Sequence, residues 1–112
     1  MVAPNIIEIT PEAASGGVPT RPSRVVNASG ALLTTDSVVL ADAAGGALVL
    51  SLPDPALYAE MTLSVKKTDG TVNTVTVTPF AAETIDGFAS VVIQTPQESV
   101  DYYCDGVNWF VL

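Results

Sequence analysis

Apolar and polar residues alternate with a period of two along most of the chain after residue 36, which is the pattern of β-strands that bury one face. The runs span residues 38–40, 48–52, 61–67, 73–79, 89–95, 99–104 and 108–112, and Thr and Val fill many of their positions. These β-branched residues pack well on a pleated surface. The pattern therefore predicts an all-β domain of about seven short strands, a small β-sandwich or barrel-like fold, with no helix of useful length.

Glycine-containing turns separate neighbouring runs and predict how they connect. A Gly-Gly pair at residues 45–46 separates the first two runs, and Asp69-Gly70 separates the next two. Such residues tolerate the positive φ angles of tight chain reversals. We therefore expect two hairpins at these turns and an antiparallel body.

Residues 1–35 differ in character from the rest of the chain. Four prolines and three glycines fall within residues 1–30. Prolines at this density prevent regular helices and remove donors from a β-ladder. We therefore divide the chain into an extended N-terminal arm, residues 1–35, and a β domain, residues 36–112.

The arm contains one β-prone piece that is too apolar for a free tail, formed by Asn5, Ile6, Ile7 and Ile9. One interpretation is that it docks on another chain, either a sister subunit or a different protein. The other is that it forms an edge strand on the chain's own domain. The sequence leaves both open.

Arg21 and Arg24 are the basic residues of the arm. Arginine can bind carboxylates through two parallel hydrogen bonds, so these side chains are candidates for anchoring the arm to a partner. The simpler interpretation is pairing within the chain or at its surface, which contributes little energy.

The composition is typical of one globular unit that exposes apolar surface. Of the 112 residues, 48% are hydrophobic and 14% are charged, and the formal net charge is −8. So few charges leave apolar surface that another chain would cover, which makes oligomerisation a working hypothesis. The negative charge disfavours nucleic acid and anionic membrane surfaces as partners.

Two absences exclude several chemistries. Cys104 is the single cysteine and the sequence has no histidine. An intrachain disulfide, a thiolate metal cluster and histidine-based catalysis are therefore impossible. The N-terminus has neither a signal peptide nor a membrane span, which predicts a protein made in the cytosol. We expect neither an enzyme nor a bound cofactor or metal.

The remaining charged and polar residues have simple structural interpretations. Six acidic residues invite comparison with calcium or glycosidase sites: Asp36, Asp42, Asp69, Glu83, Asp86 and Asp105. Three of them directly precede glycine, and carboxylates in such turns cap the backbone, so turn chemistry is the favoured interpretation. Lys66 and Lys67 are expected at the surface, and Cys104 is expected to be a buried small hydrophobe.

Three short motifs carry a resemblance to a known class of protein. They are Lys66-Lys67-Thr68-Asp69, Glu83-Thr84-Ile85-Asp86-Gly87 and Asp105-Gly106-Val107-Asn108-Trp109, in this order. Over residues 36–112 the sequence resembles a β module of virion surface proteins in tailed bacteriophages. Such modules occur in head decoration and head-fibre proteins and in tail fibres.

The resemblance implies a homotrimer whose arm attaches it to the major capsid protein, on the outer surface of a virion assembled in the host cytoplasm. A tail fibre normally carries a long shaft before such a module, whereas only about 35 residues precede it in this sequence. The implied function is therefore capsid decoration, in which the protein cements the shell. A tail-fibre or host-glycan-binding module is the alternative.

Candidate contact residues follow from these expectations. We assign the capsid-binding arm to Asn5, Ile6, Ile7, Ile9, Arg21 and Arg24, and the trimer interface to Val107, Trp109, Phe110, Val111 and Leu112. Neighbouring strand residues point to opposite faces, so one of Trp109 and Phe110 is expected in the core and the other at the interface. For glycan binding, Trp109 or Tyr58 would be the stacking ring.

Overall fold

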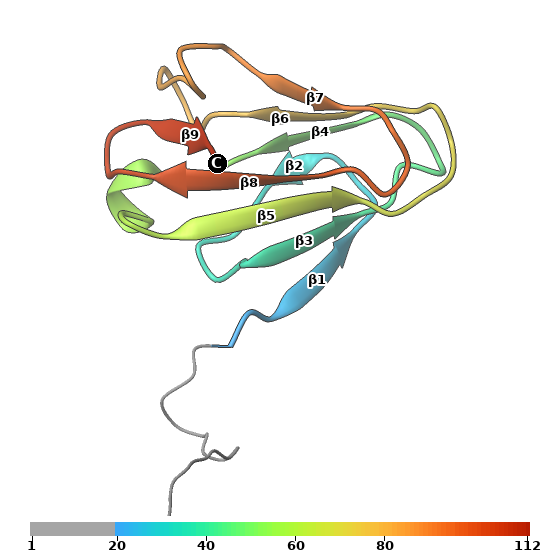
Figure 1. Cartoon of the computed structure of the whole chain (residues 1–112), viewed down its shortest axis with the longest axis horizontal. Helices are drawn as coiled ribbons and strands as arrows, with labels where there is room; N and C mark the ends of the chain where they lie inside the picture. The colour runs from blue at the N-terminus through green and yellow to red at the C-terminus, as the bar shows by residue number, and fades with distance from the viewer. Residues whose placement is uncertain (1–19) are drawn as a thin grey trace, which may run out of the picture.

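The computed structural model describes residues 20–112, which form two open, mixed β-sheets with no α-helix among them (Figure 1). The five-stranded sheet has the order β1 (Ser23–Val26), β3 (Val38–Ala41), β5 (Thr62–Lys67), β8 (Ser99–Cys104) and β9 (Trp109–Val111). The four-stranded sheet has the order β2 (Gly30–Ala31), β4 (Leu48–Ser51), β6 (Val75–Thr78) and β7 (Val91–Ile93). A single 3₁₀ turn, η1 (Pro55–Leu57), follows β4. The expected all-β character is confirmed.

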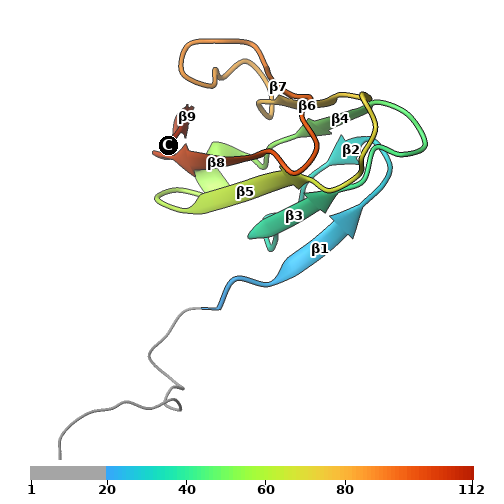
Figure 2. The ribbon, with the colours of Figure 1, turned by 45° about the vertical axis from the view of Figure 1, so that its right-hand side comes forward.

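The first six strands alternate between the two sheets. Strands β1, β3 and β5 lie parallel to one another in one sheet, and β2, β4 and β6 lie parallel in the other. The chain thus winds in successive coils, each adding one strand to each layer, as the two layers of Figure 2 show. Only the later pairs, β6 with β7, β5 with β8 and β8 with β9, are antiparallel.

The two predicted hairpins are therefore wrong. Strands β3 and β4 flank the turn at residues 45–46 but belong to different sheets, and so do β5 and β6 on either side of Asp69-Gly70. The physical reason is that these turns carry the chain across the gap between the layers. A glycine or Asp-Gly turn serves this crossing as well as it serves a reversal within one sheet.

The core fills the space between the two sheets. Residues of β5 alternate, so that Leu63 and Val65 point inward while Thr62 and Lys66 are partly exposed. The largest fully buried side chains include Trp109, Tyr58 and Tyr102. Cys104 is buried among them, as expected.

The β fold begins earlier than the sequence indicated. Strands β1 and β2 lie within residues 1–35, which were assigned to the arm, yet both pair with strands of the body. The predicted boundary at residue 35 is therefore too late, since the sheets already include Ser23. Asn5, Ile6, Ile7 and Ile9 lie outside the described residues.

Candidate interaction surface

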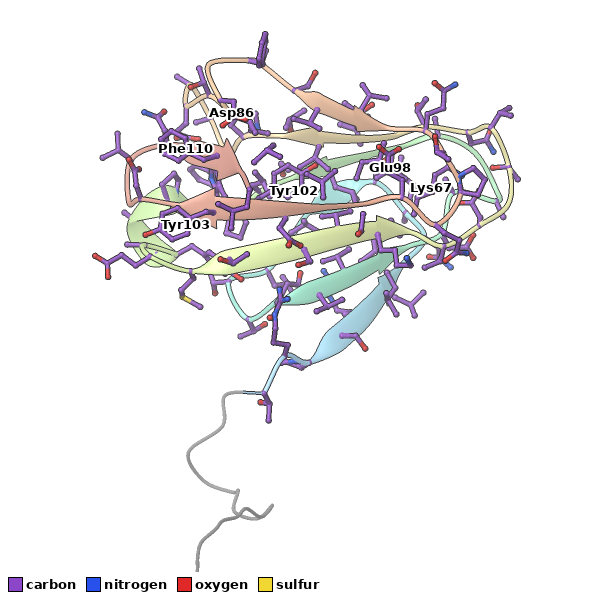
Figure 3. The ribbon with its side chains drawn as sticks, viewed as in Figure 1. Lys67, Asp86, Glu98, Tyr102, Tyr103 and Phe110 are labelled. Atoms are coloured by element: carbon purple, nitrogen blue, oxygen red, sulfur yellow. The ribbon has the colours of Figure 1, made fainter. Side chains whose placement is uncertain are left out.

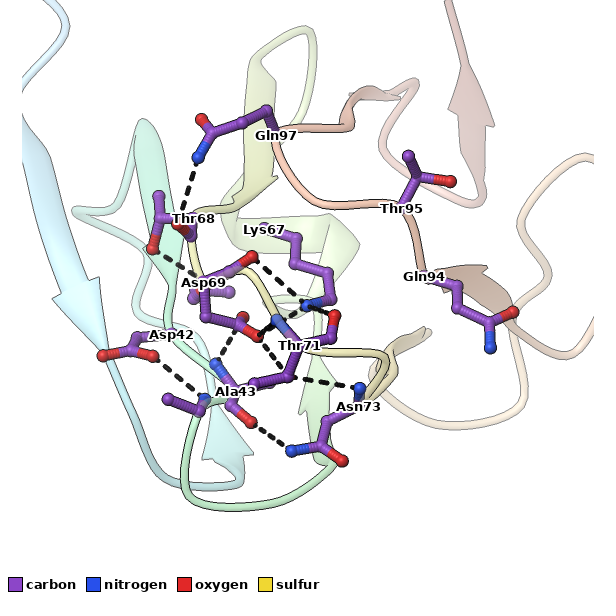
Figure 4. A network of polar contacts seen from close by, with 12 residues as sticks. Asp42, Ala43, Lys67, Thr68, Asp69, Thr71, Asn73, Gln94, Thr95 and Gln97 are labelled. Atoms are coloured by element: carbon purple, nitrogen blue, oxygen red, sulfur yellow. Dashed lines mark hydrogen bonds and ion pairs between the residues drawn. The ribbon is translucent and has the colours of Figure 1, made fainter.

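A buried ion pair occupies the corner where two successive coils cross between the sheets (Figure 4). Lys67 is fully buried, and its Nζ lies 2.6 Å from Asp69 Oδ2 and 2.8 Å from the carbonyl oxygen of Thr71. Asp69 also accepts hydrogen bonds from the Ala43 N–H at 2.8 Å and from the N–H and hydroxyl of Thr71. The amide of Asn73 donates to the Ala43 carbonyl at 2.8 Å. These bonds tie the β3–β4 loop to the β5–β6 loop.

The expectation that Lys67 is a surface residue is therefore wrong, whereas Asp69 does cap its turn. The inward alternation of Leu63 and Val65 continues to Lys67, which carries its side chain into the gap between the layers. Its charge is compensated there by Asp69. Lys66 points to the other face, where its Nζ donates to the carbonyl of Gln97 at 2.8 Å.

The motifs at residues 83–87 and 105–109 cover the edge of β9. The backbone of residues 84–86 runs along this strand, with the Trp109 N–H bonded to the Thr84 carbonyl at 3.0 Å and the Asp86 N–H bonded to the Trp109 carbonyl at 3.0 Å. Asp86 Oδ1 accepts a hydrogen bond from the Val111 N–H at 3.1 Å. An otherwise open sheet edge is thereby paired and capped.

The turn between β8 and β9 is fixed by Asp105. Its Oδ1 accepts from the N–H groups of Val107 and Asn108, both at 2.8 Å, and these bonds lower the pKa of the Asp105 carboxyl. Gly106 takes a φ of 97°, a conformation that glycine adopts without strain. Asn108 Oδ1 accepts from the Thr84 N–H at 3.2 Å. All three motifs therefore stabilise the body.

The two arginines of the predicted arm pair within the chain. Arg24 forms two parallel hydrogen bonds to the buried carboxylate of Asp36, at 2.8 and 2.7 Å. Arg21 donates to Ser64 Oγ at 2.9 Å and to both Oγ and the carbonyl of Ser37 at 3.1 Å. The structure thus shows both arginines paired within the chain, which is the simpler of the two interpretations. Any contact between either arginine and a capsid would compete with these bonds.

The two ion pairs predict how stability depends on pH. Lys67 with Thr71, and Arg24 with the Leu33 N–H, hold the pKa values of Asp69 and Asp36 below their ordinary value. The unfolded chain therefore binds more protons than the native state once the pH approaches the ordinary carboxyl pKa of about 3.9. We expect the free energy of unfolding to fall as the pH is lowered below about 5.

Urea unfolding curves between pH 7 and pH 3 would measure this loss. In a Lys67→Met variant the pKa of Asp69 is depressed less. The free energy of unfolding of this variant should therefore fall less between pH 7 and pH 3 than that of the wild type. A stability that stays constant down to pH 3 would contradict the assignment of these carboxylates.

The two rings considered for glycan stacking are not available to a ligand. Trp109 and Tyr58 pack against each other with ring centroids 5.5 Å apart, and both are buried. The Tyr58 hydroxyl donates to the carbonyl of Asp36. A stacking platform needs an exposed ring face, so the assignment of this role to either residue is wrong.

The residues predicted for the trimer interface divide between core and surface. Trp109 is buried in the chain's own core, and its inclusion in an interface is therefore wrong. Phe110 points to the opposite face and is 38% exposed, beside Tyr103 on the adjoining strand (Figure 3). Val107 and Leu112 are exposed, and Val111 is partly buried. These four remain available to another chain.

The sequence did not indicate the uncharged outer face of the four-stranded sheet. No strand of the four-stranded sheet contains a charged residue. The pairing register places Val49, Thr76 and Val92 in one row, and Ala31, Ser51 and Thr78 in another. These six residues alternate with the buried ones and make up the outer face of this sheet, which we call the four-stranded face. The alternation of Val and Thr at residues 75–78 is the sequence feature that could have indicated this face.

An apolar groove adjoins this face. It encloses about 330 Å³, and its exposed walls are Leu33, Leu57 and Phe80. The remaining lining is Ala31, Leu32, Thr34, Leu52, Pro53 and Asp54. Ala31 belongs to both the groove and the four-stranded face, so the two surfaces are continuous.

The outer face of the five-stranded sheet, in contrast, carries charged side chains. It carries Lys66, and Arg21 lies against Ser64, whose hydroxyl donates to Asp101 Oδ1. The two outer faces thus differ sharply in charge, and the uncharged one is the candidate for contact with another protein.

Within residues 20–112, no group of three His, Cys, Asp or Glu side chains is placed to hold a metal ion. The same part of the chain has no helix long and apolar enough to cross a membrane. No protein family matches the sequence, and a search of curated proteins found no similar sequence.

Proposed function

We propose that this protein is a homotrimeric structural protein of a bacteriophage virion, a capsid decoration or head-fibre protein that binds the outer capsid surface and stabilises the shell. The observation that carries the proposal is the continuous surface formed by the uncharged four-stranded face and the apolar groove, whose lining includes one carboxylate, Asp54. A monomer rarely leaves such a surface bare. An assembly protein needs it for contact with other chains.

The roles of the conspicuous residues support the same proposal. The motifs that resemble phage virion modules hold the two sheets together, through Lys67 and Asp69 at one end of the molecule and residues 84–86 with β9 at the other (Figure 3). A body stabilised in this way suits a structural protein. Attachment then falls to the segment in front of it.

The energetic advantage of a trimer lies in avidity. Three N-terminal segments on one body turn weak single contacts into one strong attachment, because the second and third contacts form at high effective concentration. Cementing follows when the segments reach different capsid subunits. In this proposal, Ile6, Ile7 and Ile9 supply the apolar contacts with the major capsid protein.

Deleting residues 1–19 tests the attachment role. The deletion ends before β1, so we expect a folded oligomer of unchanged stoichiometry by light scattering, with binding to capsids lost in a co-sedimentation assay. The capsids would be assembled from the major capsid protein encoded in the same genome. A full-length variant with Ile6, Ile7 and Ile9 changed to serine separates loss of apolar contact from loss of chain length. Capsid binding that survives the deletion would refute the role of this segment.

A further inference from the structure

We propose that the four-stranded face and the apolar groove form the surface through which copies of this chain bind one another. This inference rests on the proposed function in that it locates the subunit contact of the homotrimer. It moves the contact away from Val107, Phe110 and Leu112, to residues that no motif in the sequence singles out.

Charge is the first argument for a second copy as the occupant. The chain carries a formal net charge of −8. Two copies that meet through acidic surfaces place like charges against each other, which weakens association. The six residues of the four-stranded face carry no charge. A basic partner would be expected to use the acidic surface instead, so an uncharged face suits another acidic chain.

The side chains of this face are suited to packing. Val49 and Val92 are 51% and 53% exposed and flank Thr76 in one row across the sheet. Stiff β-branched side chains lose little rotamer entropy when a partner covers them. A sheet face of this kind can pack against another at about 10 Å.

The apolar groove adds a place for an anchoring side chain. Leu33, Leu57 and Phe80 form its exposed walls beside Ala31. Interfaces derive much of their binding energy from a few large side chains that fill such hollows and exclude water. The groove adjoins the four-stranded face at Ala31, so one partner chain can cover both.

The C-terminal surface is less suited to contact between acidic copies. The Leu112 N–H is bonded to the carbonyl of Asp101 at 3.0 Å, and the Val111 N–H is bonded to the carboxylate of Asp86 at 3.1 Å. The Asp86 carboxylate therefore lies at Val111, between the exposed Phe110 and Leu112, and Leu112 is bonded to the backbone of a second acidic residue. A partner copy would bring its own carboxylates close to them.

A pair of matched lysine variants tests the inference. Val49→Lys with Val92→Lys places two charges on the four-stranded face. Val25→Lys with Val72→Lys places the same charges at valines that are 65% and 79% exposed elsewhere. Light scattering over a range of concentrations would measure the stoichiometry of the full-length protein. Circular dichroism and thermal unfolding would check that both variants fold.

We expect the wild type and the Val25/Val72 variant to remain oligomers, and the Val49/Val92 variant to associate at least about a hundredfold more weakly, tenfold for each buried charge. A Val49/Val92 variant that stays oligomeric, while a Phe110→Lys and Leu112→Lys variant dissociates, would overturn the inference. So would a monomeric wild type.

Capsid co-sedimentation of the wild type separates this inference from the proposed function. If the wild type binds capsids while the Val49/Val92 variant keeps its oligomeric state, only the location of the contact fails. If the wild type fails to bind capsids while the Val49/Val92 variant dissociates, the attachment role fails and the subunit surface stands.

Discussion

Replacing Lys67 by alanine is expected to lower the free energy of unfolding by about 3–5 kcal/mol, because it removes one partner of a buried ion pair. The Lys67 ammonium is fully enclosed and also donates to the Thr71 carbonyl. Without it, the Asp69 carboxylate stays in the interior with no opposite charge. Urea unfolding followed by the fluorescence of the single tryptophan would measure the loss.

The neighbouring lysine provides a matched control. Lys66→Ala removes the same side chain one position earlier on β5, where it is partly exposed and, among residues 20–112, its ammonium donates only to the Gln97 carbonyl. Surface substitutions of this kind usually change stability by about 0.5 kcal/mol or less. Equal effects of the two substitutions would show that the Lys67–Asp69 pair does not stabilise the corner.

Replacing Trp109 by alanine is expected to cost about 3–5 kcal/mol, the usual loss when a large buried aromatic side chain is truncated. The indole is completely buried and packs against Tyr58, so the change leaves a cavity between the sheets. Since small domains are commonly stable by only about 5–15 kcal/mol, this loss is large. Denaturant unfolding followed by far-ultraviolet circular dichroism would measure it.

Two related variants distinguish packing from other roles of Trp109. Within residues 20–112 the indole Nε1 has no hydrogen-bond partner, so Trp109→Phe breaks no hydrogen bond and should cost much less than Trp109→Ala. Phe110→Ala removes the neighbouring ring from the outer face, where Phe110 is partly exposed, and should also cost less. A Phe110→Ala effect as large as that of Trp109→Ala would contradict the placement of these two rings.

Much of the fold could be predicted from local pattern. The alternation of apolar residues predicted all seven of the later strands, since burial of one strand face is a local property. It also predicted that Trp109 and Phe110 point to opposite faces. The burial of Cys104 followed from its residue type.

The connections could not be predicted, because they depend on which partner each strand meets. The turn at Asp69-Gly70 has the same composition whether the chain stays in one sheet or crosses to the other. Strand β1 could not be predicted for a related reason, since its exposed residues are ordered by pairing with β3, and the chain passes through β2 in the other sheet before it reaches β3.

The candidate surface was missed because it lacks any distinctive residue. Valine and threonine on the four-stranded face look like ordinary strand residues, and only the sheet register shows that Val49, Thr76 and Val92 form one row. Lys67 was expected at the surface because it is charged, although the alternation along β5 indicated that its side chain points inward. Charged residues are rarely fully buried unless they are paired, and the pairing with Asp69 was visible only in three dimensions.

The coiled path of the chain also has a consequence for how fast the protein reaches its native state. Among the paired strands of residues 20–112, only β8 and β9 are joined by a short turn. The parallel pairs β1–β3 and β3–β5 form only after the chain has crossed to the other layer and returned. Loop closure must precede every such pairing, and folds dominated by distant pairings form in about milliseconds to seconds. We therefore expect slow refolding kinetics, with the β8–β9 hairpin able to form early and the parallel strands joining late.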